Sequence, residues 1–241
     1  MRHPLTERWV STLFRDWARM FRPRYGVERR FGRDLLIDQN CPVGRNMLSR
    51  GMWERPQIEF LEAEFTRRRR SETAVFLDIG AYWGLYSLYF EKQGIFDRIV
   101  AFEPNPRSQT MLKLHLIMNS IEGEIELLPF ALSGEEGQAR MVPQGGGGAH
   151  IDSDKGDLVI ETRRLDDVVP LSDAFVVAKI DVEGHEGPVI AGMHELVANN
   201  RVLLQIEIFP QNVEKIVPKL ESLGLVRLDQ IKEDHFFTTA E

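Results

Sequence analysis

The stretch FLDIGAYWGLYSLYF (residues 76–90) decides the fold. It starts with an apolar run that ends on Asp78, turns through Gly80 and Gly84, and enters a second apolar run. A short apolar run that stops at a glycine-containing turn indicates a buried strand. The run after Gly84 extends to Gly94, a residue suited to the end of a helix. The stretch therefore predicts a strand, a tight turn and a helix.

The same alternation of strands and helices continues downstream. Strand-like runs are expected at 98–104, 125–133, 176–184 and 201–209, and helical runs at 106–120, 187–200 and 212–224. Strands that alternate with helices predict a parallel sheet covered on both faces. The last two runs, 225–231 and 235–240, are close enough for an antiparallel hairpin. The expected fold is a doubly wound, Rossmann-like α/β sheet, mostly parallel, with an antiparallel C-terminal hairpin.

Composition bounds the class of protein. The chain has 241 residues, 43% of them hydrophobic and 28% charged, which suits one globular domain with additions. No apolar run reaches the roughly 18 residues that a membrane span needs, and charges interrupt the first ten residues, so no signal peptide is expected. A single cysteine fits a reducing compartment, and we expect a cytoplasmic protein. The net charge of −7 disfavours nucleic acid as a partner.

The first 50 residues differ from the rest and are predicted to be an N-terminal extension, with the main domain at 51–241. A helix is expected there, because apolar residues recur at helical spacing. They are Trp9, Val10, Leu13, Phe14, Trp17, Met20 and Phe21. This stripe favours packing on the chain's own domain or on a second subunit; an interfacial helix on an anionic membrane is the alternative. A short strand is expected within 34–39.

Two further stretches have local interpretations. Residues 55–70 predict a helix with Pro56 in its first turn and an arginine run at its end, where positive charge suits the helix dipole. The glycines at 145–148 predict a mobile loop, which is either a lid over a site or a plain surface loop.

Acidic residues follow the predicted strands at one rim of the sheet, where doubly wound folds bind ligands. They are Asp78, Glu103, Asp181, Glu183 and Glu207. Glu103 falls 23 residues after Gly80, the place of a carboxylate that accepts ribose hydroxyls. The bulky Tyr82 and Trp83 in the first turn would crowd the pyrophosphate of NAD. S-adenosylmethionine carries positive charge and no phosphate, so it fits the acidic rim better.

With these residues in place, the chain resembles the FkbM family of class I S-adenosylmethionine-dependent methyltransferases. The resemblance covers roughly residues 50–210. It rests on the following segments: GMWERPQIEFLEAEF, VFLDIGAYWGLYSLYF, VAFEPNP, PFALSGEEG, RRLDDVV, VAKIDVEGHEGPVIAGM and LLQIEIFP. The sequence departs from the family at Tyr82 and Trp83, where an asparagine and a small apolar residue are usual, and this could reshape the methionine end of the pocket.

The resemblance implies O-methylation of a small-molecule or sugar hydroxyl, with S-adenosylmethionine as cofactor. Its implied cofactor-binding residues are Asp78, Gly80, Tyr82, Gly84, Glu103, Pro104, Asn105, Ala131, Leu132 and Asp181. A general base must take the hydroxyl proton, and the preferred catalytic residues are Asp181 and His185. Glu183 and Glu207 are further candidates for this role.

Other functions remain open at this point. Asp181 and Glu207 could hold Mg²⁺ as hard oxygen ligands, but two carboxylates alone do not make a metal site, and none is expected. The unusual turn leaves a catalytically inactive scaffold with the methyltransferase fold as the main alternative. The missing third glycine disfavours an NAD oxidoreductase, and the net charge disfavours an RNA methyltransferase.

Overall fold

The structure, a computed structural model, describes residues 24–143, 148–152 and 154–240. A seven-stranded sheet at its centre has the order β12-β13-β11-β10-β3-β4-β5. Its strands are β3 (Ala74–Ile79), β4 (Arg98–Phe102), β5 (Glu126–Leu128), β10 (Phe175–Ile180), β11 (Arg201–Glu207), β12 (Leu225–Ile231) and β13 (Asp234–Thr239). The five strands from β11 to β5 are parallel, and β13 is antiparallel to both β11 and β12. The predicted α/β fold with a mostly parallel sheet is confirmed.

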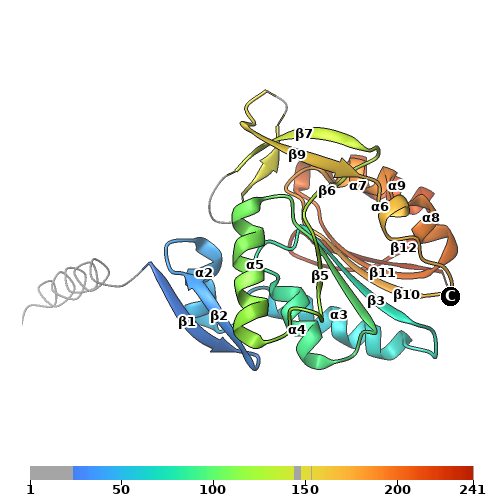
Figure 1. Cartoon of the computed structure of the whole chain (residues 1–241). Coiled ribbons are helices and arrows are strands. Elements are labelled where there is room, and N and C mark those ends of the chain that lie inside the picture. Colours follow the sequence, from blue (N-terminus) through green and yellow to red (C-terminus); the bar gives the residue numbers. More distant parts are fainter. Residues whose placement is uncertain (1–23, 144–147, 153, 241) are drawn as a thin grey trace, which may run out of the picture.

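Helices cover both faces of the sheet (Figure 1). One face carries α3 (Arg55–Arg68), α4 (Leu85–Gln93) and α5 (Pro106–Asn119); the other carries α6 (Leu165–Val168), α7 (Glu186–Ala191), α8 (His194–Asn199) and α9 (Val213–Ser222). Successive strand residues point to opposite faces, so Phe76 joins the core under α3 and α4 while Val75 and Leu77 join the other core. This two-sided burial explains the nearly continuous apolar strands.

An N-terminal unit packs against the first of these cores. It consists of β1 (Tyr25–Arg30), the antiparallel β2 (Arg33–Asp38) and α2 (Pro42–Arg50). Leu35 and Ile37 of β2 belong to the core that also holds Leu112 of α5. The expected strand at 34–39 is present as β2. The expected N-terminal helix lies outside the described residues, and the domain boundary at residue 50 stays a prediction.

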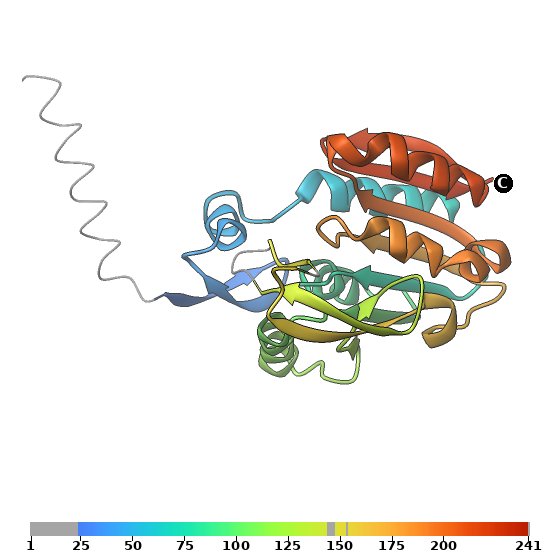
Figure 2. The same cartoon turned by 90° about the horizontal axis from the view of Figure 1, so that it is seen from above.

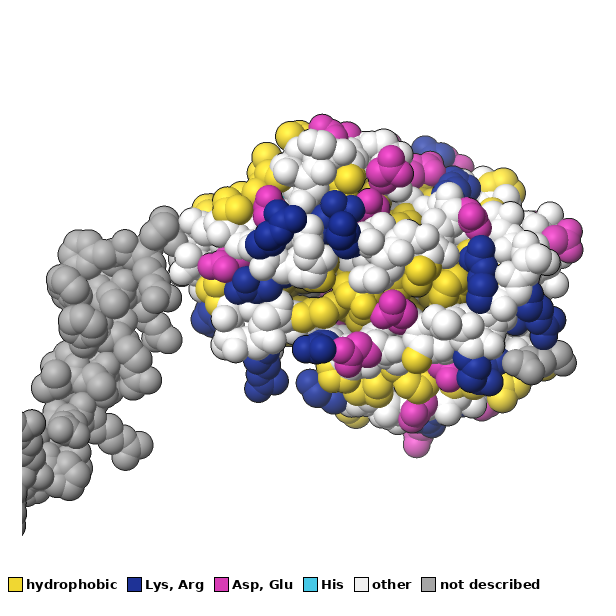
Figure 3. Space-filling model, turned by 90° about the horizontal axis from the view of Figure 1, so that it is seen from below, with side chains coloured by type: hydrophobic (Ala, Val, Ile, Leu, Met, Phe, Trp, Pro, Cys, Tyr) yellow, Lys and Arg dark blue, Asp and Glu magenta, His cyan; other side chains and the backbone are white. Residues whose placement is uncertain are grey.

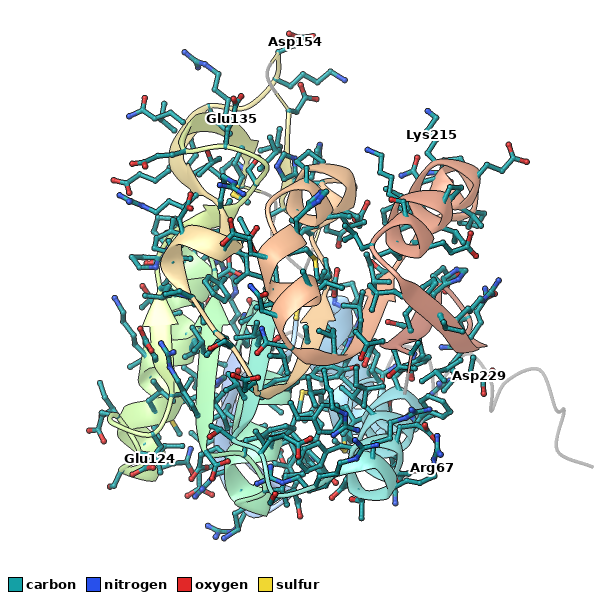
Figure 4. The ribbon with its side chains drawn as sticks, turned by 90° about the vertical axis from the view of Figure 1, so that its right-hand side faces the viewer. Arg67, Glu124, Glu135, Asp154, Lys215 and Asp229 are labelled. Carbon is teal, nitrogen blue, oxygen red and sulfur yellow. The ribbon has the colours of Figure 1, made fainter. Side chains whose placement is uncertain are left out.

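A second, four-stranded sheet lies over one end of the molecule (Figures 1 and 2). Its order is β6-β9-β7-β8, with β6 (Ala131–Leu132), β7 (Gly137–Val142), β8 (His150–Ile151) and β9 (Leu158–Arg163). The sequence did not predict β7, β8 or β9. Figure 4 places Glu135 and Asp154 of this sheet's loops at the end opposite Arg67 and Glu124, which precede β3 and β5. The small sheet therefore lies at the carboxyl ends of the parallel strands.

The expectation of one helix over 187–200 is wrong. The chain forms α7 and α8 instead, interrupted at Gly192 and Met193. A Cβ atom on Gly192 would lie 2.2 Å from the carbonyl oxygen of Ser133. The backbone of this segment therefore passes directly against the loop after β6, and this contact coincides with the break in the helix.

The surface seen from below in Figure 3 mixes Lys and Arg with Asp and Glu side chains around exposed hydrophobic atoms. This face therefore does not gather charge of one sign. Among the helices that the structure describes, none has the length and apolar character to cross a membrane.

Candidate functional site

A cavity of about 310 Å³ lies at the carboxyl ends of the parallel strands, between the central sheet and the small sheet. Residues at the carboxyl ends of β3, β4, β10 and β11 form its base, and Met141 and Ile151 of the small sheet also line it. This is where sequence reasoning placed the site. Of the expected residues, the lining includes Gly80, Tyr82, Glu103, Pro104, Ala131, Leu132, Asp181 and His185.

The turn after β3 depends on Gly80. Its φ is +81°, and a Cβ atom there would lie 1.8 Å from the carbonyl oxygen of Asp181. The N–H groups of Gly80 and Ala81 both donate to the Phe102 carbonyl oxygen at 3.0 Å. Glycine is therefore required so that β3 and β10 can approach each other at the rim, a packing reason that is separate from any ligand.

The aromatic side chains of the turn do not close the cavity. Trp83 is buried in the core shared with the N-terminal unit, and its carbonyl oxygen contacts His115 Nδ1 at 3.0 Å. The Tyr82 ring stacks on Trp83, with ring centroids 4.8 Å apart. Tyr82 also lines a second cavity of about 220 Å³ beside Cys41 and Arg107. The two residues thus join the first turn to the N-terminal unit and leave the main cavity open.

Glu103 stands at the end of β4 with 6% of its surface exposed. Its two carboxylate oxygens accept backbone N–H groups of Tyr82 at 2.7 Å and Asn105 at 2.8 Å. Burial, the largest influence, raises the pKa of Glu103 to about 7 despite these hydrogen bonds. The carboxylate keeps lone pairs for further donors in the cavity.

Three of the expected cofactor residues do not line the main cavity. Asp78 is buried and accepts hydrogen bonds from the backbone N–H and the hydroxyl of Ser87, while burial raises its pKa. Gly84 has a φ of +75° at the start of α4 and packs against Leu112. Asn105 caps α5 through the N–H of Arg107 and lines the second cavity. Each of them supports a neighbouring helix.

Acidic side chains gather where β10 and β11 end. Oxygen atoms of Asp181, Glu183 and Glu207 lie within 4.8 Å of one another. Burial and the neighbouring negative charges raise the pKa of Glu183 to about 7 and that of Glu207 to about 9. The ammonium group of buried Lys179 lies 2.9 Å from Asp181 Oδ2 and over the Tyr86 ring. Oxygens this close could share a proton or attract a cation.

His185, the other expected catalytic residue, lies on the cavity wall. Its Nε2 is 3.2 Å from Ser133 Oγ, and burial lowers its pKa, which favours the neutral ring at pH 7. His150 on β8 contacts the carbonyl oxygen of Gly148 through its Nδ1 and is not part of the cavity lining.

Sequence reasoning missed two charged residues at the site, Lys179 and Glu54. Glu54 lines the cavity just before α3; its Oε2 accepts the Tyr86 hydroxyl at 2.9 Å, and burial raises its pKa. Both lie inside segments that carry the family resemblance, KIDVEGHE and GMWERP. Lys179 is a charged residue inside an otherwise apolar strand, and this could have identified it as a site residue, because such residues are rarely buried without a partner.

Comparison with protein families agrees with this geometry. The model of the Methyltransferase FkbM domain matches residues 78–230. The chain belongs to this family.

The hexuronic acid methyltransferase AglP of Haloferax volcanii is a curated relative, 29% identical over 153 residues that cover 61% of this chain. The match spans 62% of that relative's length. Among solved structures, methyltransferase FkbM of Methylobacillus flagellatus gives a TM-score of 0.47 with 16% identity, covering 84% of this chain and 61% of that one. A putative S-adenosylmethionine-dependent methyltransferase of Methanococcus maripaludis gives 0.45 with 14% identity, covering 77% and 86%.

Proposed function

We propose that the chain transfers a methyl group from S-adenosylmethionine to a hydroxyl oxygen of a small molecule or sugar. One observation carries the proposal: in a chain of the FkbM family, the buried carboxylate of Glu103 stands at the end of β4 in a cavity at the strand ends. A carboxylate in this place suits a ribose diol, since it can accept two hydroxyl hydrogen bonds.

The residues present fit S-adenosylmethionine. Glu103 would hold the ribose, and the apolar residues Pro104, Ala131 and Leu132 would flank the adenine. At the other side, four carboxyl groups line what we call the acidic end: Glu54, Asp181, Glu183 and Glu207. Lys179 is the one Lys or Arg side chain in the described lining, so a cofactor with a sulfonium and an ammonium would offset the excess negative charge.

The chain's own contribution to the chemistry is placement and proton transfer. When bound, S-adenosylmethionine would supply an electrophilic methyl group and would keep the electrons of the carbon–sulfur bond on its sulfur. The acceptor oxygen forms the new carbon–oxygen bond and loses its proton, for which Asp181 is the base we favour. Positioned general bases typically contribute about 10²–10⁴-fold. His185, neutral at pH 7, is the alternative base.

The acidic end also bears on the acceptor. The name of the archaeal relative suggests a sugar, in that case a hexuronic acid. Here an acceptor carboxylate would meet Glu54 and Glu183, and Lys179, the one Lys or Arg in the described lining, is already paired with Asp181. We therefore expect neutral sugars and polyols to be methylated in preference to uronates. A uronate preferred by about tenfold or more would contradict this expectation.

Calorimetric titration with S-adenosylmethionine tests the cofactor first, with NAD as the control ligand. We expect binding of S-adenosylmethionine that Glu103→Ala weakens at least tenfold and that the exposed control Glu124→Gln leaves intact. Methyl transfer to neutral sugars then tests the reaction, and Asp181→Ala should abolish transfer while weakening cofactor affinity far less than Glu103→Ala does. Binding without transfer to any hydroxyl acceptor would support an inactive scaffold instead.

A further inference from the structure

We propose that Glu207 acts as a neutral acid that donates a hydrogen bond to Asp181, so that Glu207 and Lys179 together fix the carboxylate that receives the acceptor's proton. Glu207 is then a positioning residue for Asp181. The inference rests on the proposed function, because it assigns a role within that same site.

The register of the sheet brings the two side chains together. The parallel strands β10 and β11 pair Lys179 with Gln205 and Ile180 with Ile206. The next residues along the two strands, Asp181 and Glu207, therefore emerge side by side, and their carboxyl oxygens lie within 4.8 Å. Two carboxylates this close rarely both ionise; one proton shared between them removes the repulsion.

The ammonium group of Lys179 determines whether Asp181 or Glu207 keeps the shared proton. Lys179 is buried, and its ammonium group lies 2.9 Å from Asp181 Oδ2, where it stabilises a negative charge. Among the described residues, no Lys, Arg or His forms an ion pair with Glu207. Burial and the charge of Asp181 raise the pKa of Glu207 to about 9. The proton therefore belongs on Glu207, and the negative charge on Asp181.

The wider surroundings point the same way. Titratable groups surround Asp181 and Glu207 from six places, most of them are acidic, and Asp234 is the residue that pairs with Glu207 in the register of β11 and β13. They are Glu54 before α3, Asp78 on β3, Glu103 after β4, His150 on β8, Glu183 and His185 after β10, and Asp234 on β13. A second negative charge at Glu207 would add to this repulsion, whereas a neutral Glu207 does not.

This arrangement leaves Asp181 able to act. A carboxylate offers about four lone-pair positions on its two oxygens. Lys179 occupies one on Oδ2 and the Glu207 hydroxyl occupies another, so a lone pair remains for the proton of the acceptor hydroxyl. Held from two directions, Asp181 cannot rotate away from the cavity without losing both contacts.

The first test needs neither cofactor nor acceptor. Infrared spectra of the full chain are recorded at pH 8. At this pH Glu207, with its pKa of about 9, should be mostly protonated, whereas Glu183, with its pKa of about 7, should be mostly ionised. We expect a protonated-carboxyl C=O band in the wild type that Glu207→Gln removes. The matched variant Glu183→Gln, in the same cavity, should keep it. Spectra of the wild type and Glu207→Gln with the same protonated-carboxyl absorption would overturn the proposal; a band that other buried acids contribute, such as Asp78, is present in both spectra and cancels in their difference.

The second test uses the pH dependence of methyl transfer. Because Glu207 must stay protonated, wild-type kcat should fall as pH rises through about 9. Glu207→Gln keeps a hydrogen-bond donor that cannot ionise, so it should retain kcat within about tenfold and lose this fall. Glu207→Ala should lower kcat about 10²-fold, which is within the range expected when a general base loses its placement. A Gln variant as inactive as Ala would overturn the proposal and make Glu207 the base.

The two tests separate failure of this inference from failure of the proposed function. If the wild type methylates no hydroxyl, the proposed function fails, while the infrared band still decides where the proton resides. If the wild type is active and the band is unaffected by Glu207→Gln, the inference alone fails.

Discussion

At the scale of single residues, Gly80 illustrates a position that packing, rather than a ligand, dictates. Its missing side chain lets the Asp181 carbonyl oxygen approach to where a Cβ would stand, at 1.8 Å. The close packing of the turn after β3 therefore fixes the backbone position of Asp181, which belongs to the acidic end.

Gly80→Ala should therefore destabilise the fold strongly. We expect a loss of about 3–5 kcal/mol in urea unfolding, because both the positive φ and the backbone clash oppose the new methyl group. Gly94→Ala is the matched control: its φ is also positive, at +64°, but nothing lies within 4 Å. It should cost only about 1 kcal/mol. Equal losses in the two variants would show that the clash is relieved elsewhere.

Glu103 should make cofactor affinity depend on pH. Its pKa of about 7 means that the ionised form, which accepts ribose hydroxyls best, becomes dominant only above neutrality. Affinity for S-adenosylmethionine should rise about tenfold between pH 6 and pH 8, as the ionised fraction does. Calorimetry measures this rise.

The control for that measurement is Glu183→Gln, which removes the other cavity acid with a pKa of about 7. It should keep the rise, whereas Glu103→Gln should bind weakly at both pH values. An affinity that does not change between pH 6 and pH 8 in the wild type would exclude ionised Glu103 as the ribose ligand.

At the scale of elements, α5 connects the first turn of the sheet with the N-terminal unit. The Asn119 side chain accepts from the N–H of Asp34 and donates to its carbonyl oxygen, each at 2.8 Å. His115, fully buried, contacts the carbonyl oxygens of Trp83 and Leu36. These polar contacts hold β2 against α5 beside the cavity.

Replacing His115 with leucine should loosen β2 selectively. The change removes the hydrogen-bonding ring between the buried carbonyl of Trp83 and the partly buried carbonyl of Leu36, which should cost about 1–3 kcal/mol. Hydrogen exchange should speed up in β2 and stay slow in β10. The more exposed Ile117→Ala on the same helix serves as the control and should cost less than about 1 kcal/mol. Unchanged exchange in β2 would mean that apolar packing alone holds it.

At the scale of the whole molecule, buried acids concentrate around one cavity. Glu103, Glu183 and Glu207 all have pKa values raised above the ordinary value near 4.5, chiefly by burial. At any pH between a group's pKa in the unfolded state and its higher pKa in the folded state, that carboxyl group binds more protons in the folded chain than in the unfolded chain. Stability must therefore fall as pH rises through that window.

We expect the cofactor-free chain to lose about 2 kcal/mol between pH 6.5 and pH 9.5, after allowing for solvent screening of the half-buried groups. Urea unfolding at the two pH values measures this loss. Glu207→Gln should reduce it, because Glu207 has the highest of the three pKa values. A chain that grows more stable over this range would mean that these acids are already ionised at pH 6.5.

The local pattern of the sequence determined much of the fold. Apolar runs that stop at acidic or glycine residues, such as the run up to Asp78 and Gly80, specify buried parallel strands, because period and burial are local properties. The same runs placed Glu103, Asp181 and Glu207 at one rim, since carboxyl ends of parallel strands share an edge. The family was also recognisable from sequence, and its domain model matches residues 78–230.

Tertiary structure alone decided the rest, because it depends on contacts between segments far apart in the chain. The strands of the small sheet are stabilised by pairing with one another, for example β7 with β9. The Asp78 side chain points away from the cavity to Ser87, and the Trp83 side chain points into the core. The packing of α4 and α5 against the sheet determines both orientations. Lys179 and Asp181 are two residues apart in the chain, so their side chains lie on the same face of the sheet. The approach of Glu207 to Asp181, in contrast, arises from the register of β10 against β11, two strands that are far apart in the chain.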